Sequence, residues 1–159
     1  MLSEPTQAAI RKLAETYPER RTALLPALKL AQSEIGYLPP DAIGEAADLV
    51  GVPHSAAFEL ASFYTMLHMQ PVPPTQVVVC AQLPCALRGA DALIRDLHAA
   101  LQNDIDAGAL QVERTSECFG ACHRAPMARV NEAYCENLVG DARQRLIDQL
   151  KRSSNGRAG

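Results

Sequence analysis

A chain of 159 residues is long enough for one domain or for two small ones, each with a modest core. Hydrophobic residues make up 48% of the chain and charged residues 21%, which is typical of folded proteins and excludes a disordered one. The net charge is −3 and aromatic residues amount to 4%, without basic clusters. We therefore expect neither nucleic acid nor an anionic membrane surface as the main partner.

The N-terminal sequence, Met1-Leu2-Ser3-Glu4-Pro5, has neither the basic nor the apolar region of a secretory signal. We therefore expect a cytoplasmic protein, in a compartment where thiols stay reduced. The segment from Leu60 to Leu87 carries no charged residue, but four prolines interrupt it, so we expect no membrane span there.

Residues 1–70 are expected to form a small helical bundle that docks the chain onto a partner. Apolar residues recur at helical spacing in four segments, which lie at Ile10–Tyr17, Thr22–Glu34, Pro40–Val50 and Ala56–Met66. The fourth segment is apolar almost all round, which predicts either a central position in the bundle or a contact with another subunit. The candidate contact residues are Phe58, Phe63, Tyr64 and Met66.

Residues 71–152 are expected to form a second domain, which follows a proline-rich linker. Alternating and β-branched patterns predict strands, and a period of 3.6 predicts helices, which gives an α+β or α/β fold. The predicted elements, in the order strand, helix, strand, strand, helix, are Thr75–Cys80, a helix through Ala90–Leu101, Leu110–Thr115, Met127–Asn131 and Asp141–Arg152. Residues 153–159 are expected to be a polar tail.

Four of the five cysteines fall in two pairs, Cys80-x4-Cys85 and Cys118-x3-Cys122, each at or after the end of a predicted strand. If the two strands are parallel neighbours, both loops leave the sheet at the same edge, so four thiolates can surround one metal centre. A [2Fe–2S] cluster uses four cysteine ligands and suits such a site. Gly120 is small, so backbone N–H groups can approach the sulfurs and stabilise their negative charge.

Other interpretations of the cysteines stay open at this point. A structural zinc ion also accepts four thiolates, although it commonly uses C-x2-C pairs. Disulfides fit poorly with a cytoplasmic chain, unrelated buried thiols fit poorly with paired spacing, and thioredoxin-type chemistry needs a C-x-x-C motif that the sequence lacks. Cys135 stands alone and is expected to be a half-buried thiol rather than a ligand. His123 is either a surface residue or, with Arg124, an electrostatic influence on the metal centre.

Longer stretches of the sequence resemble one known family, the 24-kDa subunits of respiratory complex I, the NADH:quinone oxidoreductase. The similarity runs from about Ile10 to Lys151. Two residues depart from the family's pattern without removing a ligand: Phe119, where Leu is commoner, and Cys135, where an aromatic residue or glycine is usual. The similarity is carried by Tyr17-Pro-Glu-Arg-Arg-Thr-Ala-Leu-Leu-Pro26, Ala61-Ser-Phe-Tyr-Thr-Met66, Cys85-Ala-Leu-Arg-Gly-Ala90 and Glu117-Cys-Phe-Gly-Ala-Cys122.

The resemblance implies a helical bundle followed by a thioredoxin-like ferredoxin domain. It also implies one [2Fe–2S] cluster, held by Cys80, Cys85, Cys118 and Cys122. The cluster is expected near the FMN of a 51-kDa-type flavoprotein subunit that itself binds NADH, and the sequence has no G-x-G-x-x-G fingerprint of its own. The large iron–sulfur subunit of the peripheral arm is a further expected partner. Other subunits attach that arm to the cytoplasmic membrane. Because NADH and FMN are expected in the partner subunit, this chain is expected to have no activity alone.

Two alternatives to complex I remain open. Related subunits also serve soluble NAD-dependent formate dehydrogenases and NAD-reducing hydrogenases. The run from Val130 to Leu138 and the Tyr-Pro-Glu-Arg-Arg stretch favour complex I over these enzymes. A zinc-stabilised interaction module without a redox role is an alternative of another class.

Overall fold

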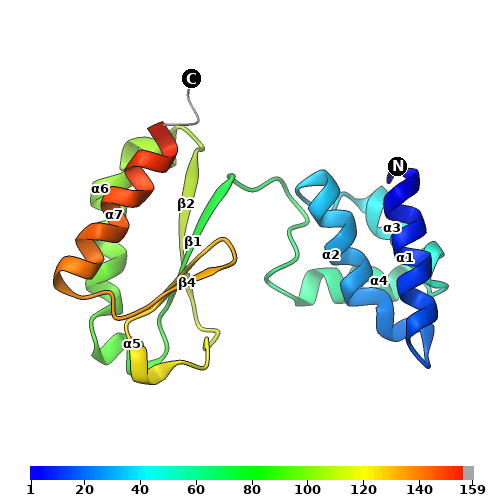
Figure 1. The fold of residues 1–159 in the computed structure, drawn as a ribbon, viewed down its shortest axis with the longest axis horizontal. Helices are drawn as coiled ribbons and strands as arrows, with labels where there is room; N and C mark the ends of the chain where they lie inside the picture. The colour runs from blue at the N-terminus through cyan, green and yellow to red at the C-terminus, as the bar shows by residue number, and fades with distance from the viewer. Residues whose placement is uncertain (156–159) are drawn as a thin grey trace. The chain divides into compact units, whose positions relative to one another are not determined.

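The computed structural model describes residues 1–155. The chain divides into two compact units, with the boundary between Val72 and Pro73 (Figure 1). Each unit has its own cluster of buried apolar side chains. The N-terminal unit is entirely helical, whereas the second combines helices with a four-stranded sheet. This arrangement is the expected α+β combination of a helical bundle and a thioredoxin-like domain.

The N-terminal unit contains four α-helices and one short 3-10 helix. The segment before the second helix is a 3-10 turn, so that helix begins at Leu24 rather than at Thr22. The helix ends at Gly36, whose φ of +91° is favourable for glycine and lets its N–H reach the Gln32 carbonyl at 2.7 Å. The elements are α1 (Glu4–Thr16), η1 (Arg20–Ala23), α2 (Leu24–Ile35), α3 (Pro40–Val50) and α4 (His54–Phe63).

The centre of this bundle is α3, and not α4 as its apolar character predicted. Six residues of α3 are buried, most of them alanine or glycine, which allow α1, α2 and α4 to approach closely. In α4 only Ala57 and Ala61 are fully buried, and Phe63 at its end is 77% exposed. The first of the two alternatives, a central position for this helix, is therefore wrong, because α3 with its mostly small buried residues lies at the centre, and the contact with another subunit stays a prediction.

The fourth helix ends at Phe63, three residues earlier than predicted, because α2 binds the segment that follows it. The Gln32 side chain donates to the Met66 carbonyl at 2.9 Å and accepts from the His68 N–H at 2.6 Å. These two hydrogen bonds pair the Met66 carbonyl and the His68 N–H, which lie beyond the end of the helix. The chain can therefore turn away from the helix while these backbone groups stay hydrogen-bonded.

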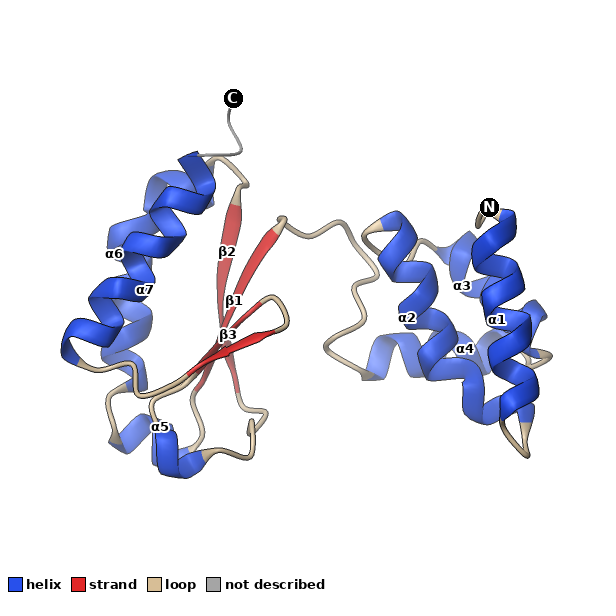
Figure 2. Cartoon of the chain, in the orientation of Figure 1, coloured by secondary structure: helices blue, strands red, loops and turns tan. Residues whose placement is uncertain are grey.

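The second unit is a mixed sheet with its two long helices on one face (Figure 2). The strand order is β2-β1-β3-β4, with β1 and β2 parallel and the other pairs antiparallel. Side chains such as Val77 and Leu97 form the core between sheet and helices. The elements are β1 (Thr75–Cys80), α5 (Leu83–Leu87), α6 (Ala90–Asp106), β2 (Leu110–Thr115), η2 (Cys122–Arg124), β3 (Ala128–Val130), β4 (Ala133–Cys135) and α7 (Gly140–Asn155).

Three features of the second unit differ from the sequence prediction. The strand β4 and the five-residue helix α5 were not predicted, because elements this short carry too few residues to show a period. The last helix runs to Asn155, so residues 153–155 of the expected polar tail are helical. The remainder of that tail, 156–159, lies outside the described residues.

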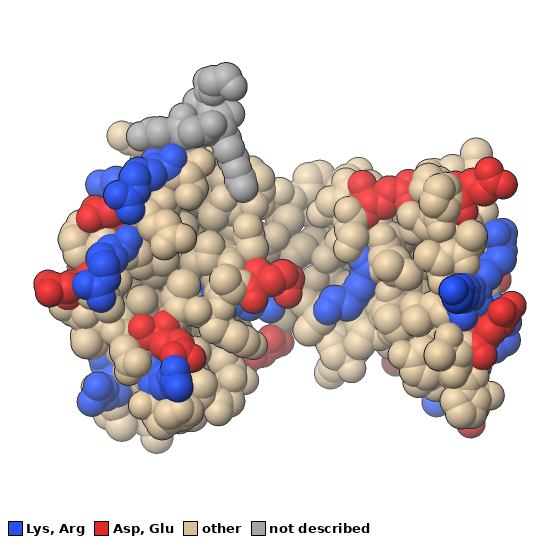
Figure 3. Space-filling view, in the orientation of Figure 1, with Lys and Arg blue, Asp and Glu red and all other residues tan. Residues whose placement is uncertain are grey.

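Two features bear on whether a membrane or a nucleic acid is a partner: the length and apolar character of the helices, and the distribution of charged residues on the surface. No helix within residues 1–155 is long and apolar enough to cross a membrane. On the visible face of each unit, Lys and Arg occur among Asp and Glu and form no continuous basic patch (Figure 3). This pattern is in keeping with the net charge of −3.

We predict that replacing Leu97 with Ala lowers the free energy of unfolding by about 2–5 kcal/mol, because the side chain is fully buried between α6 and the sheet. Urea denaturation followed by circular dichroism measures the change. Arg95→Ala, an exposed position on the same helix, is the control and should change stability by less than about 0.5 kcal/mol. Equal effects of the two substitutions would contradict this packing.

Candidate iron–sulfur site

The two cysteine loops leave the sheet side by side, at the ends of the parallel strands β1 and β2. Cys80 is the last residue of β1 and pairs with Thr115, the last residue of β2. Beyond the strands, the Ala81 N–H donates to the Thr115 carbonyl at 2.9 Å. The Gln82 side chain also donates to the Ser116 carbonyl. The loops are therefore bonded to each other, and the sequence alone did not identify Gln82 as one of the groups that join them.

Cys80 and Cys85, the inner pair, are buried, with 3% of each residue exposed. Cys85 lies in the first turn of α5, and the proline before it is favourable there because that position needs no N–H partner. The backbone of Met127 joins both cysteines. Its carbonyl accepts from the Cys80 N–H at 3.0 Å, and its N–H donates to the Cys85 sulfur. The inner pair is thus held under the end of the sheet, away from water.

Cys118 and Cys122, the outer pair, are exposed. Their Sγ atoms lie 3.8 Å apart. Two thiolates on one tetrahedral metal, with bonds of about 2.3 Å, lie about 3.8 Å apart, so this separation fits a shared metal ion. Between them, Gly120 has a φ of +75° and its N–H donates to the Cys118 sulfur at 3.4 Å. Glycine is favoured here because the left-handed conformation is costly for other residues.

The sulfurs of the two pairs influence one another electrostatically. Burial raises the pKa of the Cys85 thiol, and the charges of Cys80 and Cys122 raise it further, against the opposing Met127 N–H. The hydrogen bond with Cys118, together with burial and the charges of Cys118 and Cys80, raises the pKa of Cys122. Cysteine binds a metal as the thiolate, so metal binding at this site would require the thiols to release their protons.

The arrangement of the donors, two neighbouring pairs of cysteines, can be compared with what a mononuclear and a binuclear centre need. Throughout the part of the chain that the structure describes, no three His, Cys, Asp or Glu side chains converge on one point where a metal ion could sit. A structural zinc ion needs four ligands around one point. A [2Fe–2S] cluster needs two pairs of thiolates, one pair for each iron, and the chain presents two neighbouring pairs of cysteines. The donor set therefore fits the cluster.

Cys135 lies on β4 and is separated from the inner pair by the strand register. It pairs with Ala128, which pairs with Val79, so Cys135 belongs to the row of residues that faces the helices. Cys80 belongs to the alternate row of β1. Burial raises the pKa of the half-buried Cys135 thiol. This placement favours the expectation that Cys135 is not a ligand.

The residues that follow Cys122 form a hydrogen-bonded group. Arg124 makes an ion pair with Glu136, and its Nε donates to Nε2 of His123 at 3.1 Å. His123 and Arg124 follow Cys122 directly and are candidates from the sequence, whereas Glu136 is not, because only the pairing of β3 with β4 brings it to the same turn. Opposite charge at a distance of twelve residues is no signal by itself.

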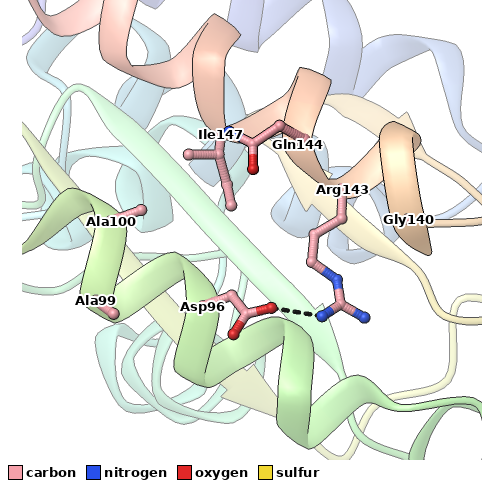
Figure 4. Close-up of a pocket in the computed structure, with 7 residues that line it drawn as sticks. All are labelled: Asp96, Ala99, Ala100, Gly140, Arg143, Gln144 and Ile147. Atoms are coloured by element: carbon pink, nitrogen blue, oxygen red, sulfur yellow. Dashed lines mark hydrogen bonds and ion pairs between the residues drawn. The ribbon is translucent and has the colours of Figure 1, made fainter.

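A hollow in the surface of this unit lies between α6 and α7, and no cysteine lines it (Figure 4). Arg143 of α7 donates to Asp96 of α6 at 2.5 Å, and its Nε donates to the Leu138 carbonyl at 3.4 Å. Because this guanidinium already has acceptors, we interpret the hollow as a junction between the two helices. The hollow is lined by Asp96, Ala99, Ala100, Gly140, Arg143, Gln144 and Ile147.

Comparison with known proteins gives consistent similarities. The thioredoxin-like [2Fe-2S] ferredoxin family matches residues 10–151. The chain is 34% identical over 145 residues to a subunit of the NADH-quinone oxidoreductase of Rhizobium meliloti, covering 89% of this chain and 86% of that one. It is 32% identical over 163 residues to the mitochondrial NADH dehydrogenase [ubiquinone] flavoprotein 2 of Dictyostelium discoideum, covering 94% of this chain and 63% of that one.

Among solved structures, an NAD+-reducing [NiFe]-hydrogenase in the H2-reduced state is similar, with a TM-score of 0.66 and 26% identity. The similar region covers 81% of this chain and 22% of the hydrogenase chain. The same kind of hydrogenase in the air-oxidized state gives a TM-score of 0.67 at 24% identity, covers 86% of this chain and 24% of that one, and supports the fold alone.

We predict that replacing any one of Cys80, Cys85, Cys118 or Cys122 with Ala abolishes the intact cluster, because each iron needs two thiolates. Cys135→Ser should retain it, since Cys135 lies in the row that faces the helices. Iron and sulfide content, together with the EPR signal after reduction, measures the outcome. Loss of the cluster in Cys135→Ser, with one of the four others dispensable, would contradict the assignment. A colourless wild-type protein that contains zinc would support the mononuclear alternative instead.

Proposed function

This chain belongs to the thioredoxin-like [2Fe-2S] ferredoxin family, and on that premise we propose that it is an electron-transfer subunit of an NADH:quinone oxidoreductase. The observation that carries the proposal is the meeting of two cysteine pairs at one edge of a thioredoxin-like sheet. The subunits of NADH-quinone oxidoreductases that align over most of this chain support the choice of complex. The chain thus serves as one part of an oxidoreductase.

The cluster, held by Cys80, Cys85, Cys118 and Cys122, supplies one-electron chemistry that needs neither a proton nor a change in the bonds of the chain. The chain itself does three things for it. Burial of the inner pair excludes water, and the N–H groups of Met127 and Gly120 stabilise negative charge on the sulfurs. Exposure of the outer pair brings the site to the surface, where an electron can pass to a neighbouring chain.

The source of the electrons lies in a partner. The sequence lacks the glycine fingerprint of dinucleotide sites, so we assign NADH and FMN to a 51-kDa-type flavoprotein subunit. A flavin receives a hydride as two electrons and can pass them on singly, which a nearby one-electron centre permits. The large iron–sulfur subunit of the peripheral arm is the other proposed neighbour, and the arm lies on the cytoplasmic side of the membrane.

Exposed apolar side chains on both units suit such a partner. On the N-terminal unit Phe63 is 77% exposed and stacks edge to face with Tyr64 at 5.2 Å. On the second unit α5 exposes Leu83 and Leu87, by 68% and 79%. Aromatic side chains such as Phe63 are enriched at interface centres, and exposed aliphatic side chains add apolar area around them. We assign the bundle, residues 1–70, the role of anchor, and residues 71–152 the role of cluster carrier.

A second candidate host has support from the fold. The hydrogenase similarity at a TM-score of 0.66 favours an equivalent subunit of a soluble NAD-reducing hydrogenase, or of a related formate dehydrogenase. In such an enzyme the cluster would have the same role, one-electron transfer, because the proposed partner is again a flavoprotein. Co-purification of the native protein with its neighbours distinguishes the hosts, because a quinone-linked complex and a soluble dehydrogenase differ in their other subunits.

We predict that the purified chain alone does not oxidise NADH, because its sequence has no G-x-G-x-x-G fingerprint and the flavin is assigned to the partner. Addition of the flavoprotein subunit should give NADH oxidation with ferricyanide as the acceptor. Absorbance at 340 nm measures both reactions, and the flavoprotein alone is the control. NADH turnover by the pure single chain would refute the division of labour between the subunits.

We also predict that Phe63→Ala weakens binding of the flavoprotein subunit by about tenfold or more, because an exposed aromatic anchor loses its contact area. The cluster content should stay unchanged, since Phe63 belongs to the other unit. Titration by surface plasmon resonance gives the Kd. Lys29→Ala, an exposed position on α2 of the same unit, is the matched control and should bind like the wild type. Undiminished affinity of Phe63→Ala would argue against the bundle as the anchor.

A further inference from the structure

A charged group at the turn that carries Cys122 is unused by the function proposed above. The 3-10 turn η2 places Arg124 two residues after Cys122. The guanidinium of Arg124 forms an ion pair with Glu136, which follows the last residue of β4. Its Nε also donates to His123 at 3.1 Å. Arg124 thereby connects the turn that bears Cys122 to the segment that follows β4.

Backbone hydrogen bonds run alongside this ion pair. The Asn137 N–H donates to the Arg124 carbonyl at 2.8 Å, and the Leu138 N–H donates to the Pro126 carbonyl at 3.0 Å. The Arg124 N–H in turn donates to the Ala121 carbonyl at 2.9 Å, which closes the turn itself. The turn that bears Cys122 is thus attached to the chain after β4 at three points, two in the backbone and one in side chains.

The two charges act on the metal centre in opposite directions. One-electron reduction adds a negative charge to a [2Fe–2S] cluster, and nearby charges and hydrogen bonds set the potential at which this happens. The positive guanidinium of Arg124 favours the reduced state, whereas the carboxylate of Glu136 opposes it. Arg124 lies two residues after Cys122, and the ion pair holds Glu136 to it, so both charges belong to the turn that bears this cysteine.

We propose that Arg124 and Glu136 are positioning residues of the iron–sulfur site, which hold the Cys122 turn against the end of β4 and set the reduction potential of the cluster by the balance of their charges. This inference rests on the proposed function, since it requires the cluster. Neither residue is a ligand. The side chains are 51% and 33% exposed, and an ion pair this exposed contributes little to folding stability, so the potential is the property to measure.

The test is an EPR-monitored redox titration of the full-length, cluster-loaded chain at one pH and one ionic strength. Glu136→Gln should raise the midpoint potential, because the reduced cluster loses a nearby negative charge. Arg124→Gln should lower it for the converse reason. We expect each change to alter the equilibrium constant for reduction by about tenfold, which is about 59 mV for one electron. The double variant should lie between the two, and Arg124→Lys, which retains the charge, should lie near the wild type.

The ion pair of Arg143 with Asp96, which joins α6 to α7, is the matched control (Figure 4). Arg143→Gln and Asp96→Asn should leave the potential unchanged. Shifts of both Arg124→Gln and Glu136→Gln in the same direction, or the absence of any shift, would overturn the inference. If Arg124→Gln assembles no cluster, the sign of the shift in Glu136→Gln decides alone. A wild-type chain without a cluster would instead refute the proposed function, so the two failures are distinguishable.

Discussion

The parallel pairing of β1 with β2 is the constraint on which the site depends. Parallel strands end at the same edge of a sheet, so the loops that follow Cys80 and Thr115 emerge as neighbours. In an antiparallel pair of six-residue strands the same loops would emerge about 20 Å apart, too far for one centre. The long helix α6 between the two strands makes the parallel connection possible, and its buried face supplies much of the core.

Burial divides the four thiols into two kinds, and the division suits an electron carrier. The inner pair is buried and is hydrogen-bonded to the backbone of Met127, so this burial would shield bonds between these sulfurs and a bound metal from water. The outer pair lies at the surface on a loop whose glycine permits a left-handed turn and an N–H donor to sulfur. One half of the site is therefore held by the core of the unit, and the other half is open to a partner.

The N-terminal unit completes its own core without help from the cysteine-bearing unit. Its centre is a helix of small residues, α3, against which larger side chains from α1 and α2 pack, including Ile10 and Leu28. Phe63, at the end of α4, lies outside this core and is exposed. A unit that has its own core and exposes an aromatic side chain is suited to binding another chain, which is the role proposed for it.

The sequence alone determined how the four cysteines fall into two neighbouring pairs, because C-x4-C and C-x3-C spacing at strand ends is a local property. The periodicity of the sequence also located the long helices and the strands β1 and β2.

The other features depended on the tertiary structure. The strand β4 is defined by its pairing with β3, because a segment of three residues is too short to show a periodic pattern in the sequence. The same pairing brings Glu136 to Arg124 and puts Cys135 in the row facing the helices. The helix α3 lies at the centre of the bundle because its small residues allow the neighbouring helices to pack closely. The apolar composition of α4 had indicated a central position for that helix as one of two alternatives. Spacing along the chain encodes local geometry, but which distant groups meet depends on strand register and packing.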